Sequence, residues 1–174
     1  MLHDTHDAIV NDWKANAQDH DAENYNFLRR LKRRSSGKMV DRIALQLHQE
    51  VFQIVDCTRC ANCCRRLRPV FTDDDIDRIA HHLERTREQF VAAFLEWDEE
   101  EHRHRTNSTP CPLLGEDNQC TAYDVRPETC KEYPYTDKKD FVFSVISRAN
   151  HALVCPAAFA IVEGMKKRFR EDDL

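Results

Sequence analysis

Apolar residues recur every three to four positions through most of the chain, which is the spacing of one face of an α-helix. Residues 38–55 show it most clearly, and seven apolar residues there form one stripe: Val40, Ile43, Ala44, Leu47, Val51, Ile54 and Val55. The same spacing predicts helices over residues 4–19 and 21–34. Ser35, Ser36 and Gly37 break the pattern, so the second and third helices are expected to be separate elements.

Polar signals predict three further helix starts. Thr72 precedes three aspartates, which suit the positive N-terminus of a helix whose buried residues would be Ile76, Ile79, Ala80 and Leu83. Thr86 and Gln89 form a capping box, and the apolar residues of that helix would be Phe90, Phe94, Leu95 and Trp97. Pro156 is a favoured first residue of a last helix.

The remaining part of the second half lacks helical spacing. Residues 106–140 are rich in proline and turn residues, and residues 141–146 read as a short strand. The sequence therefore predicts a mainly α fold: a single small domain of helices packed round a cysteine-rich metal-binding loop region, with at most a short strand or hairpin. We expect an N-terminal helical segment over residues 1–50 and a cysteine-cluster metal-binding domain over residues 51–174.

Composition and charge narrow the possible partners. The chain is 41% hydrophobic and 33% charged, with a net charge of -5, so no global basic field attracts nucleic acid or an acidic membrane. No apolar run approaches the roughly 20 residues of a membrane-spanning helix. The first residues lack the features of a signal peptide, so we expect a cytoplasmic protein without membrane or nucleic-acid partners.

Eight cysteines carry the candidate chemistry. Four form the run Cys57-x-x-Cys60-x-x-Cys63-Cys64, and four are spread over the second half: Cys111, Cys120, Cys130 and Cys155. In a reducing cytosol, thiols at this spacing are expected to be metal ligands rather than disulfides.

The spacing leaves two kinds of centre open. Three thiolates at x-x spacing, with a remote cysteine that precedes a proline, are typical of a [4Fe-4S] cluster, and Cys111-Pro112 and Cys155-Pro156 both offer that remote ligand. Eight thiolates can equally form two tetrahedral zinc sites. The cofactor is therefore predicted as an iron–sulfur cluster or zinc.

The motifs resemble the YkgJ-type cysteine-cluster family, a zinc- or iron-chelating domain of which flagellin lysine N-methylase is a relative. The matching residues are Cys57, Cys60, Cys63 and Cys64, then Pro110-Cys111-Pro112-Leu113, Cys120-Thr121-Ala122-Tyr123 and Arg126-Pro127-x-x-Cys130, and last Cys155. The resemblance covers about residues 50–165, with all eight cysteines in register. We take all eight as candidate metal ligands, and the alternative for some of them is to pack as buried free thiols. The resemblance does not carry methylase activity over, because no site for a methyl donor is recognisable in this chain.

Arg126 is a candidate cofactor-binding residue, since a guanidinium beside a four-thiolate centre would offset its negative charge. We expect a metal-binding protein that acts in electron transfer or as an accessory to an oxidoreductase. A structural zinc domain whose helical N-terminus binds a protein partner, and a small protein-modifying enzyme, are the alternatives.

Overall fold

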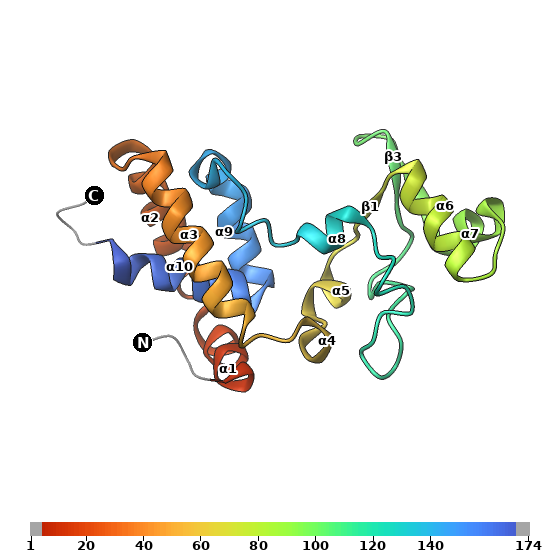
Figure 1. Ribbon diagram of the computed structural model, residues 1–174, viewed down its shortest axis with the longest axis horizontal. Coiled ribbons are helices and arrows are strands. Elements are labelled where there is room, and N and C mark those ends of the chain that lie inside the picture. The colour runs from red at the N-terminus through yellow and green to blue at the C-terminus, as the bar shows by residue number, and fades with distance from the viewer. Residues whose placement is uncertain (1–4, 170–174) are drawn as a thin grey trace. The chain divides into compact units, whose positions relative to one another are not determined.

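The computed structural model describes residues 5–169, which form two compact units (Figure 1). The helical unit consists of residues 5–56 and 134–169, and the cysteine unit of residues 57–133. The mainly α fold class is confirmed, with a small antiparallel sheet beside the helices. The division of the chain into residues 1–50 and 51–174 stays a prediction.

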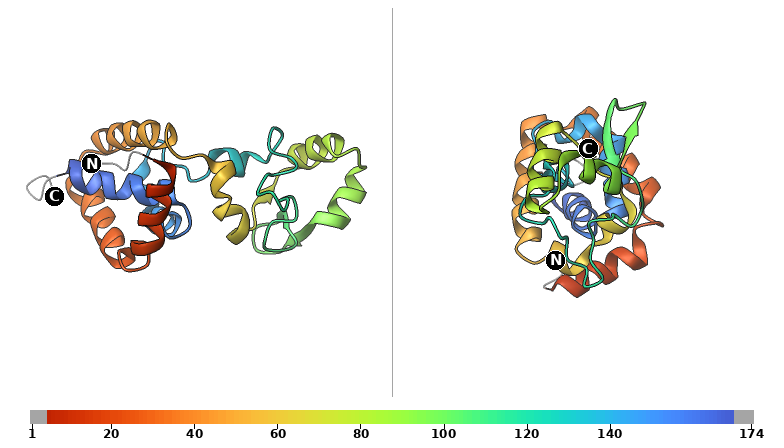
Figure 2. Two further views of the ribbon diagram at one scale, coloured as in Figure 1. Left: turned by 90° about the horizontal axis from the view of Figure 1, so that it is seen from below. Right: turned by 90° about the vertical axis from the view of Figure 1, so that its right-hand side faces the viewer.

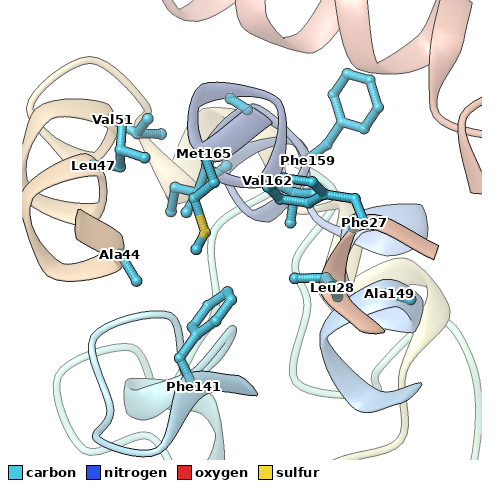
Figure 3. Close-up of a cluster of buried hydrophobic side chains, with 14 of the residues drawn as sticks. Phe27, Leu28, Ala44, Leu47, Val51, Phe141, Ala149, Phe159, Val162 and Met165 are labelled. Atoms are coloured by element: carbon cyan, nitrogen blue, oxygen red, sulfur yellow. The ribbon is translucent and has the colours of Figure 1, made fainter. Parts of the chain in front are cut away.

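The helical unit is built round its last helix. Its elements are α1 (His6–Asn16), α2 (Asp21–Arg34), α3 (Gly37–Phe52), the 3-10 helix η1 (Phe141–Ser144), α9 (Val145–Val154) and α10 (Pro156–Arg168). Nine of the thirteen residues of α10 are buried, and α1, α2, α3 and α9 all pack against it. Figure 2 shows the dark blue α10 beside the orange α3. Its core side chains, such as Phe159, Val162 and Met165, lie among apolar side chains of α2, α3, η1 and α9 (Figure 3).

The predicted helices are present, and the range 21–34 matches α2, but α1 and α3 each end three residues before the predicted end, at Asn16 and Phe52. Helix α2 ends at Arg34 and α3 begins at Gly37, which places the break at Ser35-Ser36. Pro156 occupies the first turn of α10, where its missing N–H costs no hydrogen bond.

The predicted strand at residues 141–146 is wrong. The segment forms η1 and the first turn of α9, because the Asp41 carboxylate accepts hydrogen bonds from the backbone N–H groups of Asp140 and Phe141, both at 2.9 Å. These bonds fix the start of the helical turn. The buried residues then follow helical spacing: Phe141, Val142, Val145, Ala149 and Ala152.

The cysteine unit combines short helices with a three-stranded sheet. Its elements are α4 (Cys57–Cys60), α5 (Asn62–Arg66), β1 (Val70–Phe71), α6 (Asp73–His82), α7 (Arg87–Phe94), β2 (Leu95–Asp98), β3 (Arg103–Thr106) and α8 (Glu128–Glu132). The strand order is β1-β3-β2, and both pairings are antiparallel. Both predicted caps are present as complete capping boxes, Thr72 with Asp75 and Thr86 with Gln89.

One expectation for this unit is wrong: Leu95 and Trp97 do not extend the helix that begins after Thr86. Helix α7 ends at Phe94, and the next residues form β2, in which Leu95 pairs with Thr106 and Trp97 with His104. Pairing with β3 overrides the local helical spacing. A second core supports the sheet and includes Phe71, Ile76, Phe90, Leu113 and the thiol of Cys111.

In the described part of the chain, no single helix is long and apolar enough to cross a membrane. The pair Phe141–Val154 and Pro156–Arg168 reaches that length and composition only when taken together, and it is bent by 119° at the break.

The close approach of α10 to α3 gives a test of the core. A Cβ at Gly164 would lie 2.8 Å from Cδ2 of Leu47, which is only 1% exposed. We expect Gly164→Ala to lower the free energy of unfolding by about 1–3 kcal/mol through overpacking, and Leu47→Ala to lower it by about 2–5 kcal/mol through the cavity it leaves. Urea unfolding followed by circular dichroism measures both.

The double variant is the control. With Leu47 shortened, the new methyl group of Gly164→Ala fills part of the space left behind, so the two losses should not add. Strictly additive losses would show that Leu47 does not set the space at Gly164.

Candidate metal centre

Two one-turn helices carry the four clustered cysteines. Cys57 and Cys60 begin and end α4, and Cys63 and Cys64 lie in α5. Ala61 joins the helices in the left-handed conformation, with φ 48° and 3% exposure. A residue with a Cβ takes this conformation at a cost of about 1 kcal/mol, and hydrogen bonds across the junction hold it. The N–H of Ala61 donates to the carbonyl of Cys57 at 2.9 Å.

Cys111 lies directly against this ligand loop. Its backbone N–H donates to the carbonyl oxygen of Cys64 at 2.7 Å, and the Sγ atoms of Cys63 and Cys64 are 3.9 Å apart. The Cys111 side chain is buried in the second core. The cysteine that precedes Pro112 is therefore held beside the CxxCxxCC run by the backbone itself.

Cys120 sits at the end of a tight turn that is tied to the same loop. Leu114 and Cys120 form an antiparallel bridge, and Gly115 N donates to Gln119 O at 2.8 Å. Arg65 connects the turn to the ligand loop, since one guanidinium nitrogen donates to the carbonyl of Cys60 at 3.1 Å and another to Oδ1 of Asn118. This residue fixes the distance between two cysteine-bearing segments.

Cys130 is placed by α8, which is anchored to β1 and α6. The Thr129 hydroxyl donates to the carbonyl of Val70 at 2.9 Å, and the N–H of Glu128 donates to the Asp75 carboxylate at 3.4 Å. Arg78 pairs with the same carboxylate and donates to the carbonyls of Val125 and Arg126, both at 3.2 Å. Asp75 thus caps its own helix and also holds the segment that leads to Cys130.

Four thiols of the unit interact electrostatically. Burial raises the pKa of Cys111 to about 11 and that of Cys130 to about 12, and it also raises the pKa of Cys120. A negative charge on Cys64 raises the pKa of each of these three thiols further. Cys64 itself has a pKa lowered to about 7, first by its hydrogen bond with Cys63 and then by the charges of Arg65 and Arg126.

The donor set fits a soft metal ion. Thiolates that are half-buried and mutually repulsive are stabilised by a bound cation, and thiolate is the ligand that zinc and iron–sulfur centres favour. Within residues 5–169, no three His, Cys, Asp or Glu side chains already converge as the ligands of one ion. The eight cysteines all lie in this described range, and none of them forms a disulfide.

The predicted ligands divide between the two units. Seven cysteines belong to the cysteine unit, and Cys155 belongs to the helical unit, where it is the residue before α10 and its N–H donates to the carbonyl of His151 at 2.7 Å. Which of the eight bind a metal stays a prediction.

Arg126 is held by Tyr123. Its guanidinium carbon lies 4.1 Å from the centre of the Tyr123 ring, and Nη1 donates to the Tyr123 carbonyl at 2.7 Å. Its charge lowers the pKa of Cys64 and of Cys120, although other effects on these two thiols are larger. The sequence predicts Arg126 as a candidate residue of the site but neither Arg65 nor Arg78. The only available signal for Arg65 was its position directly after Cys64.

The sequence was compared with models of known protein families, with curated proteins and with solved structures. A family model for the CxxCxxCC family, described as a putative zinc- or iron-chelating domain, matches residues 56–149, more than half of the chain. The chain belongs to the CxxCxxCC family. No curated protein and no solved structure matches it. The matched range holds seven cysteines and ends before Cys155, and membership in this family supports metal binding by the cysteine cluster.

The thiol environments of the metal-free protein predict an order of reactivity. Cys64 should react with iodoacetamide well before Cys111 and Cys130, because only the thiolate attacks and the pKa of Cys64 is about 7 while the other two are about 11 and about 12. The rate at Cys64 should rise through neutral pH and level off above it, while Cys111 and Cys130 stay protonated. Peptide mass spectrometry after timed quenching measures the order. Unfolding in urea should abolish the difference, and earlier reaction of Cys130 would contradict the assignment.

The charge of Arg126 should matter for metal affinity. Arg126→Gln is expected to weaken metal binding by roughly tenfold, because it removes a positive charge beside the thiols, whereas Arg126→Lys keeps that charge and should lose less. Competition with a chromophoric chelator measures the affinity. Arg85→Lys, a change at the corner between α6 and α7, serves as the control. Equal affinity of the Gln and wild-type proteins would remove Arg126 from the centre.

Proposed function

We propose that the cysteine unit holds an iron–sulfur cluster and that the protein acts in electron transfer or as an accessory to an oxidoreductase. The observation that carries the proposal is the 2.7 Å hydrogen bond from Cys111 N to Cys64 O. It supports a ligand set of three cysteines at x-x spacing and one remote cysteine that precedes a proline, which are Cys57, Cys60, Cys63 and Cys111.

The surroundings of these cysteines suit a negatively charged cluster. Arg65 and Arg126 supply positive charge beside Cys64. Charge, hydrogen bonds to sulfur and burial are the quantities through which a protein sets a reduction potential. When bound, the cluster would supply one-electron transfer, and the chain's own part is to hold and orient it.

A structural zinc site is the second candidate, and a separate observation favours it. Cys64, Cys111, Cys120 and Cys130 influence one another's ionisation, so they form a group of four neighbouring thiols. Four thiolates are the complete ligand set of a tetrahedral structural zinc ion. Zinc held in this way would join α5, the turn before Cys120 and α8, and the unit would then serve as a protein-interaction domain.

The two ligand sets share Cys111 and differ elsewhere, which gives the decisive experiment. The protein is purified anaerobically from iron-replete cells, and iron, acid-labile sulfide and zinc are measured per chain. We expect iron and sulfide in the wild-type protein, their loss in Cys60→Ser and their retention in Cys130→Ser, because Cys130 lies outside the proposed cluster ligands.

The matched control is Cys155→Ser, which removes a thiol from the helical unit and should leave the metal content unchanged. A colourless wild-type protein that contains zinc without sulfide, and that loses zinc in Cys130→Ser but not in Cys60→Ser, would replace the iron–sulfur assignment by the zinc site.

A further inference from the structure

One stretch of the helical unit is strongly basic, although the chain as a whole is acidic. Residues 29–42 contain seven Lys or Arg residues and one acidic residue, Asp41, whereas the whole chain has a net charge of -5. Asp41 already accepts hydrogen bonds from the backbone of residues 140 and 141. Arg29 and Lys32, on the exposed side of α2, form no ion pair with any carboxylate in the part of the chain that the structure describes.

Two apolar side chains protrude beside these charges. Phe143 is 64% exposed and Ile146 is 66% exposed, the largest values among the big hydrophobic residues that are described. The ammonium of Lys32 lies 5.5 Å from the centre of the Phe143 ring, and both η1 and α9 pack against α2. We call Arg29, Lys32, Phe143 and Ile146 the basic patch.

The tip of the β2–β3 hairpin also combines an exposed aromatic side chain with charged residues, but there the charges are mainly negative. Glu99, Glu100 and Glu101 are exposed, and they form no ion pair within the described residues. The Asp98 carboxylate fixes the turn, since it accepts hydrogen bonds from Glu100 N at 2.9 Å and Glu101 N at 3.1 Å. Trp97, one residue before this turn, is 48% exposed and meets His104 edge-on. We call Trp97 with the three glutamates the acidic tip.

We propose that the acidic tip of one copy of this chain docks on the basic patch of a second copy. Each surface combines an exposed aromatic side chain with a cluster of charges, and the predominant signs are opposite: three glutamates and the exposed Arg103 at the tip, against Arg29 and Lys32 on the patch. Aromatic side chains supply most of the binding energy of such contacts, and opposite charges orient the encounter and raise its rate.

The proposed contact is heterologous, which determines how the copies assemble. It joins two different surfaces, so every copy keeps one of each, and the chains associate head to tail. A hairpin tip on a small patch buries less area than a stable interface needs, so the association is weak and depends on concentration. It also depends on salt, because exposed charges are screened over a few Å at high ionic strength.

Sedimentation velocity of the full-length, metal-loaded protein tests the proposal. We expect the weight-average mass to rise with protein concentration in low salt and to fall to the monomer value in about 0.5 M NaCl. Phe143→Ser, a change at an exposed position, should weaken the association at least tenfold. A wild-type protein that stays monomeric at all concentrations in low salt would overturn the proposal and leave the patch to a different acidic partner.

Charge reversal identifies the two surfaces. The tip variant is Glu99→Lys/Glu100→Lys/Glu101→Lys, and the patch variant is Arg29→Glu/Lys32→Glu. Each should be monomeric alone, whereas an equimolar mixture should form a complex, because the unchanged patch of the first meets the unchanged tip of the second. Failure of the mixture to associate would overturn the pairing.

The matched control is Lys14→Glu/Asp19→Lys, which reverses two exposed charges of the helical unit outside the patch and should associate like the wild type. Circular dichroism confirms that each variant keeps its helical content. The result does not depend on which metal the cysteine unit holds.

Discussion

The cost of ionising thiols that pack in or against an apolar core is the constraint on which the cysteine unit depends. Cys111 belongs to its apolar core, and Cys64 and Cys120 pack against that core, so these sulfur atoms cannot move into water without opening it. Burial alone would keep them protonated, as the raised pKa values of Cys111 and Cys130 show. A cation bound at these thiols would replace their protons and offset the repulsion between the thiolates, which would couple metal binding to the folding of this unit.

The scaffold around the thiols works mainly through backbone carbonyl groups. Arg65 binds the carbonyl of Cys60, and Arg78 binds the carbonyls of Val125 and Arg126. Arg78 thereby joins α6 to a segment that is distant in sequence and has little regular structure, and Arg65 does the same for α5 through the side chain of Asn118. Arg78 is itself held by Asp75, whose carboxylate also caps α6. A single carboxylate therefore couples the start of a helix to the position of Cys130, which explains how helices of one turn can hold a defined group of side chains.

The sequence predicts those features whose cause is local. Thr72 and Thr86 cap helices because the partners of their side chains lie three residues away, and Pro156 starts a helix for an equally local reason. The errors occur where distant residues decide the structure. Trp97 leaves its helical pattern to pair with His104, and residues 141–146 become helical because of Asp41, a hundred residues earlier. The same limit applies to the site: the cysteine spacing indicates a metal centre, but the role of Arg65 depends on Asn118, which no local pattern connects to it.

The two Cys-Pro pairs have the same sequence but different structural surroundings. From sequence, Cys111-Pro112 and Cys155-Pro156 are equivalent candidates for a remote cluster ligand. In the structure, Pro156 opens a helix of thirteen residues in the helical unit, and that position favours proline whether or not a metal is present. Pro112 has no such reason, since it follows a buried cysteine whose N–H is bonded to the ligand loop. Proline after cysteine thus occurs in two different settings here: Cys155 precedes the start of a helix, whereas the backbone contact of Cys111 holds it beside the CxxCxxCC run.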